Sequence, residues 1–231
     1  MTLRTSNING LFRVKSNLLT NGGVTPPFNT LSTSFDGIDE QIDFTQVDLN
    51  SSFTTSFWFK PINLGASFLV GRSTNSDYVW LRTSSQIRVR VNFTTYTFTE
   101  TGGNNINTGA WNHLFIVRGS GNNLTLYLNG ATFSTSQSAS GNHRLTQIGG
   151  VGTSFYDGNV DEVAFWDSDQ SLNLNSVYNS GVPNDISSLS PLLWYRMGDS
   201  DVYPTISDNA GSNDATMQNM SSSNFVADVP I

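Results

Sequence analysis

Two adjacent carboxylates are the first residues in the sequence whose types could do chemistry. Asp161 and Glu162 lie among apolar and aromatic residues in "GNVDEVAFWD", residues 158–167. Two carboxyl groups that face one cleft, about 5–10 Å apart, can cleave a glycosidic bond. Along a regular strand, however, alternation assigns one face to Asp161, Val163, Phe165 and Asp167, and the other to Val160, Glu162, Ala164 and Trp166. A bulge at Gly158 would turn Asp161 without bringing Glu162 to the same side, so we expect no acid/base pair here.

The sequence offers little else for catalysis. It has no cysteine and only two histidines, His113 and His143. A zinc site needs three or four ligands, and a general base needs a partner within hydrogen-bond reach. No motif around either histidine meets these requirements. We therefore expect a protein that is not an enzyme and has no catalytic cofactor.

Calcium is the metal for which the sequence has candidate ligands. Asp199, Asp201 and Asp208 lie in "GDSDVYPTISDN", and Asp214 follows closely. Loop carboxylates are oxygen ligands of the kind that Ca²⁺ takes, but their spacing here does not match the calcium-loop template. Aspartates in turns also accept backbone N–H groups, and this second role is the favoured prediction.

Glycan binding would use exposed aromatic rings together with Asn and Asp side chains at loop tips. Tyr78, Trp80, Tyr96 and Tyr156 are candidate platforms. Aromatic residues in a sheet of this kind more often belong to the core. The sequence does not choose between these two roles for any of the four.

The charge and the hydropathy pattern disfavour two classes of partner. The formal net charge is −7, and the nine arginines and two lysines are scattered apart from "RVR" at 88–90. Phosphate binding needs a concentrated basic surface, so no nucleic-acid partner is expected. No stretch approaches the ~18–20 apolar residues of a membrane span, and residues 1–23 contain no apolar signal-peptide core. We therefore expect neither membrane insertion nor secretion by a signal peptide.

The segments that must position these candidates have the periodicity of strands. Apolar residues alternate with polar ones in "SFTTSFWFKP" (52–61), "QIRVRVNF" (86–93) and "LTLYLNG" (124–130). The inward residues expected from this pattern are Phe53, Thr55, Phe57, Phe59, Ile87, Val89, Val91, Phe93, Leu124, Leu126 and Leu128. A turn is expected at Asn129-Gly130, and one short helix around 172–181, ending at Gly181. One buried and one wet face per strand indicates antiparallel sheets in a sandwich.

Residues 1–30 differ from the rest of the chain. They are weakly apolar, show no sustained period, and close on "NGGVTPPFNT", where Gly-Gly and Pro-Pro interrupt regular structure. We interpret 1–30 as an extended N-terminal arm, with an edge strand as the alternative, and 31–231 as one domain.

Several segments resemble the laminin-G-like, concanavalin A-like jelly-roll domains in order and spacing. They are "LSTSFDGIDEQIDF", "SFTTSFWFKP", "GAWNHLFIVRGSGNNLTLYLNGA" and "FYDGNVDEVAFWDSDQS". Trp111 and His113 match the family's W-x-H strand start, and "DGNVDEVAFWD" matches its "DGxIDEVxxY" strand. The resemblance covers about 31–180 and implies an all-β antiparallel β-sandwich with a jelly-roll topology. It also implies that His113 is structural, and that the motif's Asp satisfies backbone donors at a strand end.

Glycanases of the same superfamily carry an E-x-D-x-E strand whose carboxylates share one cleft. The nearest alternating sets here are Asp39, Gln41 and Asp43, and Asp157, Asn159 and Asp161. Each set lacks a glutamate and has an amide at its centre. The resemblance therefore does not extend to hydrolysis, and fold alone implies no chemistry.

The C-terminal stretch "LSPLLWYRMGDSDVYPTISDNAGSNDATMQNM" (189–220) resembles the returning strand of laminin-G-like proteins, which pairs with the start of the domain. The residues of this stretch are similar to those of laminin-G-like proteins of marine tailed bacteriophages. The resemblance implies a non-enzymatic virion structural protein, a capsid decoration or tail-associated protein at the virion surface, assembled in the host cytoplasm. The implied partners are a major capsid or tail protein and further copies of the chain.

In that interpretation the N-terminal arm docks the protein to the particle. The expected docking residues are Leu3, Ile8, Leu11, Phe12, Val14, Leu18 and Leu19. The alternative is a carbohydrate-binding adhesion module for a cell-surface glycan, with calcium as a candidate requirement. A glycan hydrolase is the third and least favoured hypothesis.

Overall fold

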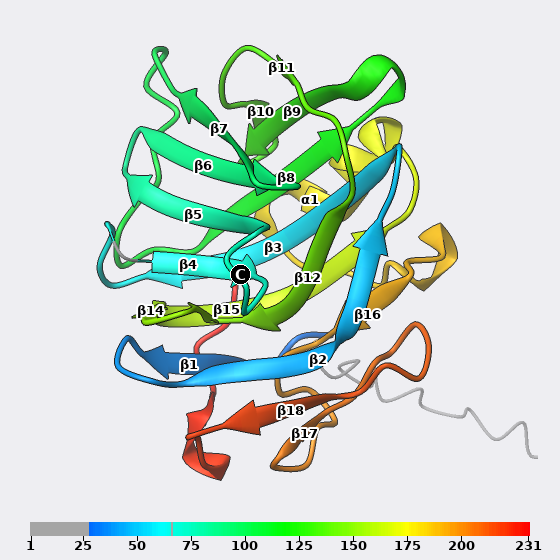
Figure 1. Ribbon diagram of the computed structural model, residues 1–231. Coiled ribbons are helices and arrows are strands. Elements are labelled where there is room, and N and C mark those ends of the chain that lie inside the picture. Colours follow the sequence, from blue (N-terminus) through cyan, green and yellow to red (C-terminus); the bar gives the residue numbers. More distant parts are fainter. Residues whose placement is uncertain (1–27, 66) are drawn as a thin grey trace, which may run out of the picture.

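The computed structural model describes residues 28–65 and 67–231, and two antiparallel sheets pack face to face over one core (Figure 1). Sheet A runs in the order β10-β9-β8-β3-β15-β1-β19, with β11 paired to β9 and β16 to β15. Its strands are β1 (Ser32–Asp36), β3 (Phe53–Pro61), β8 (Asn112–Arg118), β9 (Asn123–Leu128), β10 (Ala131–Thr132), β11 (Gln137–Ser138), β15 (Asp157–Trp166), β16 (Leu193–Tyr195) and β19 (Phe225–Val226).

Sheet B runs in the order β17-β18-β2-β12-β4-β5-β6-β7. Its strands are β2 (Gln41–Leu49), β4 (Ser67–Gly71), β5 (Tyr78–Thr83), β6 (Gln86–Val91), β7 (Thr94–Thr99), β12 (His143–Ile148), β17 (Thr205–Ile206) and β18 (Ala215–Gln218). A small hairpin of β13 (Gly150–Val151) and β14 (Ser154–Phe155) stands outside both sheets. The predicted all-β concanavalin A-like jelly roll is confirmed.

The alternation of apolar residues predicts the core well. On β3, β6 and β9 the inward phenylalanines, valines, isoleucine and leucines are fully buried. Phe93 is the exception: it was expected inside but is 62% exposed. Asn92 and Phe93 both have left-handed backbone angles and form the two-residue turn between β6 and β7, so Phe93 lies beyond the end of the strand. The turn expected at Asn129-Gly130 is confirmed, with φ values of 50° and 77°.

A second apolar cluster lies on the outer face of sheet A. It consists of Phe115, Val117, Ala164, Trp166, Val177, Ile186 and Trp194. The connection between β15 and β16 supplies its cover, with the short helix α1 (Leu174–Tyr178) and 3₁₀ turns at Ser171–Asn173, Asn179–Gly181 and Ser187–Leu189. The expected helix is present, but left-handed Asn179 rather than Gly181 ends it. Two further 3₁₀ turns span Ser120–Asn122 and Ser222–Asn224.

The C-terminal stretch closes one edge of both sheets. Strand β18 lies within 189–220 and pairs with β2, as expected of the returning segment, whereas β16 of the same segment pairs with β15. Beyond residue 220, β19 pairs with β1. The predicted arm comprises residues 1–30. Residues 1–27 lie outside the described residues, and Phe28, Asn29 and Thr30 are described. The seven expected docking residues also lie outside the described residues. None of the helices in the described part of the chain has the length and apolarity needed to cross a membrane.

Candidate functional site

The carboxyl groups of Asp161 and Glu162 lie on the same side of sheet A. On β15 and β3, Asp161 faces Trp58 and Ala164 faces Ser56, so β15 has one extra residue between these pairs. Glu162 is in this bulge and has a left-handed backbone, with φ of 45°. A bulge shifts the alternation by one residue. The expectation that the two carboxylates diverge is therefore wrong.

The same bulge changes the predicted faces of the whole strand. Val160 lies in the main core together with Val163 and Phe165, although strict alternation placed Val160 opposite these two residues. The outward residues are Asp161, Glu162, Ala164 and Trp166. A bulge at Gly158 would not have produced this result, because the extra residue is Glu162 itself.

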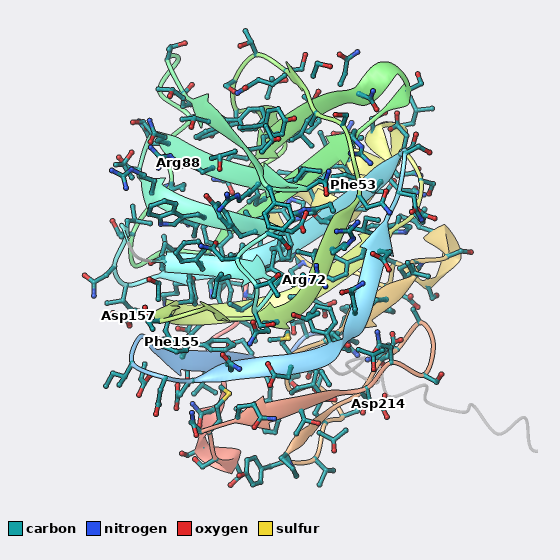
Figure 2. All side chains as sticks on the ribbon, viewed as in Figure 1. Phe53, Arg72, Arg88, Phe155, Asp157 and Asp214 are labelled. Carbon is teal, nitrogen blue, oxygen red and sulfur yellow. The ribbon has the colours of Figure 1, made fainter. Side chains whose placement is uncertain are left out.

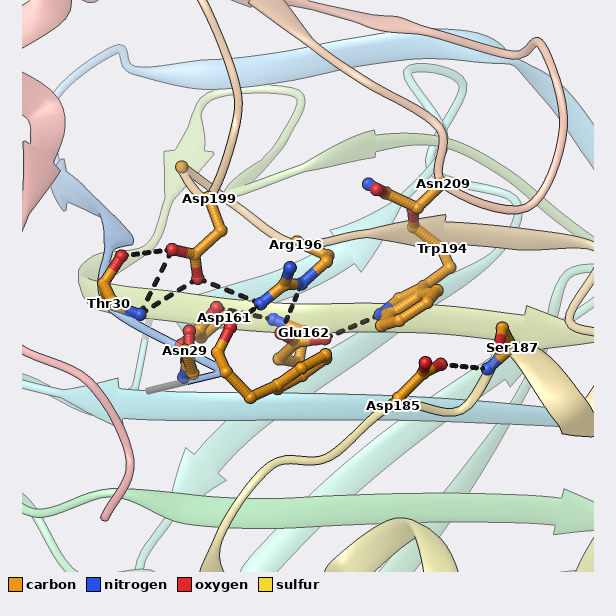
Figure 3. Close-up of polar contacts among 12 residues, drawn as sticks. Asn29, Thr30, Asp161, Glu162, Asp185, Ser187, Trp194, Arg196, Asp199 and Asn209 are labelled. Carbon is orange, nitrogen blue, oxygen red and sulfur yellow. Dashed lines mark hydrogen bonds and ion pairs between the residues drawn. The ribbon is translucent and has the colours of Figure 1, made fainter. Parts of the chain in front are cut away.

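Both carboxyl groups are buried and held by specific donors (Figure 3). Asn29 Nδ2 donates to Asp161 Oδ2 at 2.7 Å, and Trp194 Nε1 donates to Glu162 Oε2 at 2.6 Å. Arg196 Nε lies 3.2 Å from Glu162 Oε1. Burial raises the pKa of Asp161 well above its usual range, and the charge of Glu162 adds to this effect. Burial also raises the pKa of Glu162 to about 7, against the opposing effect of Arg196.

The pair is closed to a polymeric substrate. Asp161 is fully buried and Glu162 is 5% exposed. A cavity of about 10 Å³ beside Glu162 is lined by Trp58, Asn184 and neighbouring residues, which is room for about one water molecule. A glycosidase site needs a cleft that admits a sugar ring and a water. In this conformation the carboxyl pair instead holds two segments against β15. Asp161 binds Asn29 of residues 28–30, and Glu162 binds Trp194 and Arg196 of residues 194–199.

The two histidines are buried in separate places. His113 Nε2 lies 2.8 Å from Ser56 Oγ, and its Nδ1 has no hydrogen-bond partner among the described residues. Burial lowers the pKa of His113 to about 3. A Ser–His nucleophile needs a third group that orients the imidazole, and no such group contacts Nδ1. His143 stacks on Phe53 with ring centroids 5.4 Å apart.

The three candidate calcium ligands accept backbone N–H groups. Asp208 accepts from Trp194, Ala210 and Asn213 at 3.0–3.1 Å. Asp201 accepts from Gly198 and Ser207, both at 2.8 Å. Asp199 accepts from Thr30 N at 3.1 Å and contacts Arg196. In the segments 28–65 and 67–231, no three His, Asp or Glu side chains converge as metal ligands would. This geometry matches the favoured role in turns.

The structure separates the four candidate aromatic platforms. Tyr156 is fully buried, and Tyr96 packs against the main core. Tyr78 and Trp80 lie on the outer face of sheet B, because Val79 and Leu81 take the inward positions of β5. Only this outer face can present them to a ligand.

One row of residues crosses the outer face of sheet B. The strand registers place in one line Thr205, Thr216, Asp43, Gln147, Gly71, Tyr78, Arg90 and Thr95. Neighbouring strands lie about 4.8 Å apart, so residues three strands apart in this row are roughly 14 Å apart. The row passes from an acidic and amide-bearing half to an aromatic and arginine-bearing half.

A polar depression occupies the first half of this row. Its volume is about 240 Å³, and it is lined by Asp43, Phe44, Ser73, Thr146 and Gln147. Gln147 Nε2 donates to Asp43 Oδ1 at 3.1 Å. Gln147 is only 8% exposed, and Gln147 Oε1 and Thr146 Oγ1 have no hydrogen-bond partner among the described residues. Both oxygens are themselves shielded from solvent, so the polar groups that a ligand can reach in the depression are those of half-buried Asp43 and exposed Ser73.

The second half of the outer face is aromatic. Phe68 stacks on Trp80 with ring centroids 4.9 Å apart, and Tyr78 meets Phe68 edge-on at 5.1 Å. Val151 of the β13–β14 hairpin packs against this cluster. The hairpin approaches so closely that a Cβ on Gly71 would lie 2.3 Å from Val151 Cγ2. Because Gly71 has no side chain, the hairpin can pack closely against β4, between the depression and the aromatic cluster.

Three arginines surround the aromatic cluster. The guanidinium carbons of Arg82 and Arg88 lie 4.9 and 5.1 Å from the centre of the Trp80 ring. That of Arg90 lies 5.7 Å from the Tyr78 ring. Figure 2 labels Arg88 on β6, at the margin of this view of the molecule. Sequence reasoning named Tyr78 and Trp80 but missed the depression, because Asp43 and Gln147 are 104 residues apart in the chain.

These features define a two-sheet antiparallel β-sandwich with a polar and aromatic outer face on sheet B. The concanavalin A-like lectin/glucanases superfamily matches residues 36–175, more than half of the chain. The protein therefore belongs to this superfamily.

Two solved structures share most of the fold. A presumed carbohydrate-binding protein from Bacteroides ovatus ATCC 8483 is 17% identical, with a TM-score of 0.67, and the match covers 88% of this chain and 61% of that protein. The heptameric SAP-like pentraxin of Limulus polyphemus is 14% identical, with a TM-score of 0.54, and the match covers 81% of this chain and 95% of the pentraxin. At these identities the likeness shows the fold alone. No curated protein matches the sequence.

Proposed function

We propose that the protein is a carbohydrate-binding module that holds a glycan on the outer face of sheet B. The observation that carries this proposal is the polar depression, in which half-buried Asp43 and exposed Ser73 line an open space and the Gln147 amide holds the Asp43 carboxylate in place. Sugar hydroxyls donate and accept hydrogen bonds, so a carboxylate, an amide and a hydroxyl in one hollow suit them. Superfamily membership and the likeness to the Bacteroides ovatus protein support the same function.

The test is binding to a broad array of immobilised glycans by the full-length protein and two variants. Gln147→Leu removes the amide from the depression while keeping a similar volume. Gln46→Leu is the matched control, since Gln46 lies on β2, outside the depression, and contacts Asp48. We expect Gln147→Leu to weaken glycan binding about tenfold, as for a lost buried hydrogen bond, and Gln46→Leu to bind like the wild type. Equal binding by all three proteins would contradict the proposal.

We propose in addition that this binding is not accompanied by hydrolysis. The closed environment of Asp161 and Glu162 supports this proposal, as does the absence of an E-x-D-x-E strand. The measurement is release of reducing ends from every glycan that the array identifies. Release that Asp161→Asn abolishes would overturn it.

A second proposal concerns where the module acts: on a bacteriophage particle, docked to a capsid or tail protein through its N-terminal segment. The chain enters the described domain at Phe28, which stacks on Trp194 on the outer face of sheet A. That face is opposite to the proposed glycan face, so attachment on this side leaves the depression open. Removal of 1–27 should abolish association with purified particles and preserve glycan binding. Absence of the protein from particles, measured by proteomics, would end this proposal.

A further inference from the structure

The basic residues of the chain are concentrated beside the aromatic cluster. Residues 68–99 contain four of the eleven basic residues and one of the eighteen acidic ones. The remaining seven basic residues are outnumbered by seventeen acidic ones. The single acid of the segment, Asp77, is buried and accepts from Asn92 N at 2.7 Å and Ser76 Oγ at 2.8 Å. In the described part of this acidic chain, sheet B therefore carries a positively charged surface.

The arginines of this surface have no carboxylate partner in the described part of the chain. The ion pairs there involve Lys60, His143, Arg144 and Arg196. Arg82, Arg88 and Arg90 take part in none of them. Arg88 Nε is also buried without a hydrogen-bond partner. Arg90 donates to the carbonyl oxygens of Phe93 and Asn75 at 3.2 and 3.0 Å, but its charge is not neutralised by a carboxylate. We infer that the charge of all three arginines is available to an anionic ligand.

The aromatic rings hold these arginines in place. A guanidinium that stacks on a ring keeps its N–H donors for a ligand and loses little further conformational freedom on binding. Phe68 already stacks on Trp80, and Arg82 and Arg88 lie over the same ring. The Trp80 ring is thus covered rather than open to a sugar. Its role in this arrangement is to position two guanidinium groups, which suit carboxylate or sulfate oxygens.

The depression beside the arginines limits which anion fits. Asp43 and Gln147 stand in the same cross-strand row as Tyr78 and Arg90, roughly 14 Å from Gln147 to Arg90 at the strand spacing. A carboxylate at Asp43 attracts sugar hydroxyls and repels phosphate. The formal charge of −7 also opposes a nucleic acid, which carries a phosphate at every residue. A glycan with neutral and acidic sugars satisfies both halves of the face.

We propose that the ligand is an acidic polysaccharide, whose carboxylate or sulfate groups bind Arg82, Arg88 and Arg90 while a neighbouring sugar occupies the depression. This inference rests on the proposed function, because it names the class of glycan for the same face. The attraction is electrostatic in part, so binding should weaken as ionic strength rises.

The test compares matched pairs of immobilised polysaccharides that differ in charge. Polygalacturonate is set against its methyl-esterified form for the carboxylate, and carrageenan against desulfated carrageenan for the sulfate. Single-stranded DNA is a third ligand. The proteins are the full-length wild type, Arg82→Gln and Arg88→Gln, with Arg144→Gln as the matched control. Arg144 lies on the same face and loses the same charge, but it is already paired with Asp48 at 3.3 Å.

We expect the wild type to prefer at least one acidic member about tenfold over its neutral form, and each of the two test variants to reduce this preference about tenfold. Arg144→Gln should keep it. Thermal unfolding verifies the fold of each variant, and exposed Arg82 gives the decisive result if Arg88→Gln does not fold. Equal binding to charged and neutral members overturns this inference and leaves the proposed function standing. Binding to no glycan overturns both, and tighter binding to DNA overturns the choice of a glycan.

Discussion

Asp161 and Glu162 are consecutive residues whose carboxyl groups both face the outside of sheet A, because Glu162 is a one-residue bulge in β15. Two carboxylates so close together in a buried place cannot both ionise without cost. Asn29, Trp194 and Arg196 donate to them, and burial raises the pKa of both groups. The pair therefore links the start of the domain to its returning strand and makes this link depend on pH.

The first prediction concerns Glu162 and the stability of the fold between pH 4.5 and about 7. In the folded protein the pKa of Glu162 is raised to about 7 from an ordinary value of 4.5. Within this window the folded state keeps a proton that the unfolded state has lost, so the free energy of unfolding falls as pH rises. Glu162→Gln should reduce this fall and leave the part that comes from Asp161, whose pKa burial also raises. Urea unfolding at a series of pH values measures it, with exposed Glu100→Gln as the control. The same slope in Glu162→Gln and wild type would contradict the assignment.

His113 should act in the opposite direction on the acid side. Burial lowers the pKa of His113 from 6.5 to about 3, so the unfolded state takes up a proton that the folded state excludes. The free energy of unfolding should therefore fall as pH decreases from about 6.5 toward about 3. His113→Gln should flatten this part of the curve, whatever its effect on stability at neutral pH. Thermal unfolding from pH 3 to 7 provides the measurement, and an unchanged slope would count against a buried neutral imidazole.

Gly71→Ala should destabilise the protein and disturb the glycan face. The new Cβ would lie 2.3 Å from Val151 Cγ2 and 3.0 Å from the Asp77 carbonyl oxygen, and overpacking of this kind costs about 1–3 kcal/mol. Gly102→Ala is the control, because only the end of the Glu100 side chain is near its Cβ. The melting temperature should fall for Gly71→Ala and stay near the wild-type value for Gly102→Ala. Equal melting temperatures would show that the hairpin does not pack on β4.

Two truncations test the clamp at the start of the domain. Removal of 1–27 keeps the contacts of Phe28, Asn29 and Thr30, whereas removal of 1–30 deletes the Asn29–Asp161 and Thr30–Asp199 hydrogen bonds. It also leaves the buried Asp161 carboxyl group without its side-chain donor, so that only Glu162 N still donates to it, at a cost of about 1–3 kcal/mol. The shorter chain should therefore unfold at lower denaturant concentration than the chain that lacks only 1–27. Identical midpoints would mean that these contacts do not stabilise the sandwich.

The alternating strands could be predicted from the sequence because their cause is local. In β6 every second residue is apolar, and Ile87, Val89 and Val91 are all fully buried. The bulge in β15 had no such signal, since a glutamate rather than glycine takes the left-handed backbone conformation at 162. The extra residue is defined only by the register of β15 against β3, which the residues of β15 alone do not indicate.

Only the aromatic half of the candidate site could be predicted from the sequence, because the other half depends on contacts between distant strands. Tyr78 and Trp80 could be named as platforms, but both faces of "YVWL" are apolar, so the sequence did not show which face is inside. The depression depends on the pairing of β12 with β2, which brings Gln147 opposite Asp43. Such a pairing is a property of the sheet topology and is absent from either strand alone.

The entry of the chain at Phe28, on the side opposite to the depression, has a consequence for many copies together. Copies attached through their N-terminal sides to one scaffold would present their glycan faces in a common direction. A polysaccharide repeats the same sugars along its length, so several copies could engage one strand at once. Linked weak sites gain avidity of about 100-fold or more without any new contact. A shallow, low-affinity face would then be sufficient for firm adhesion.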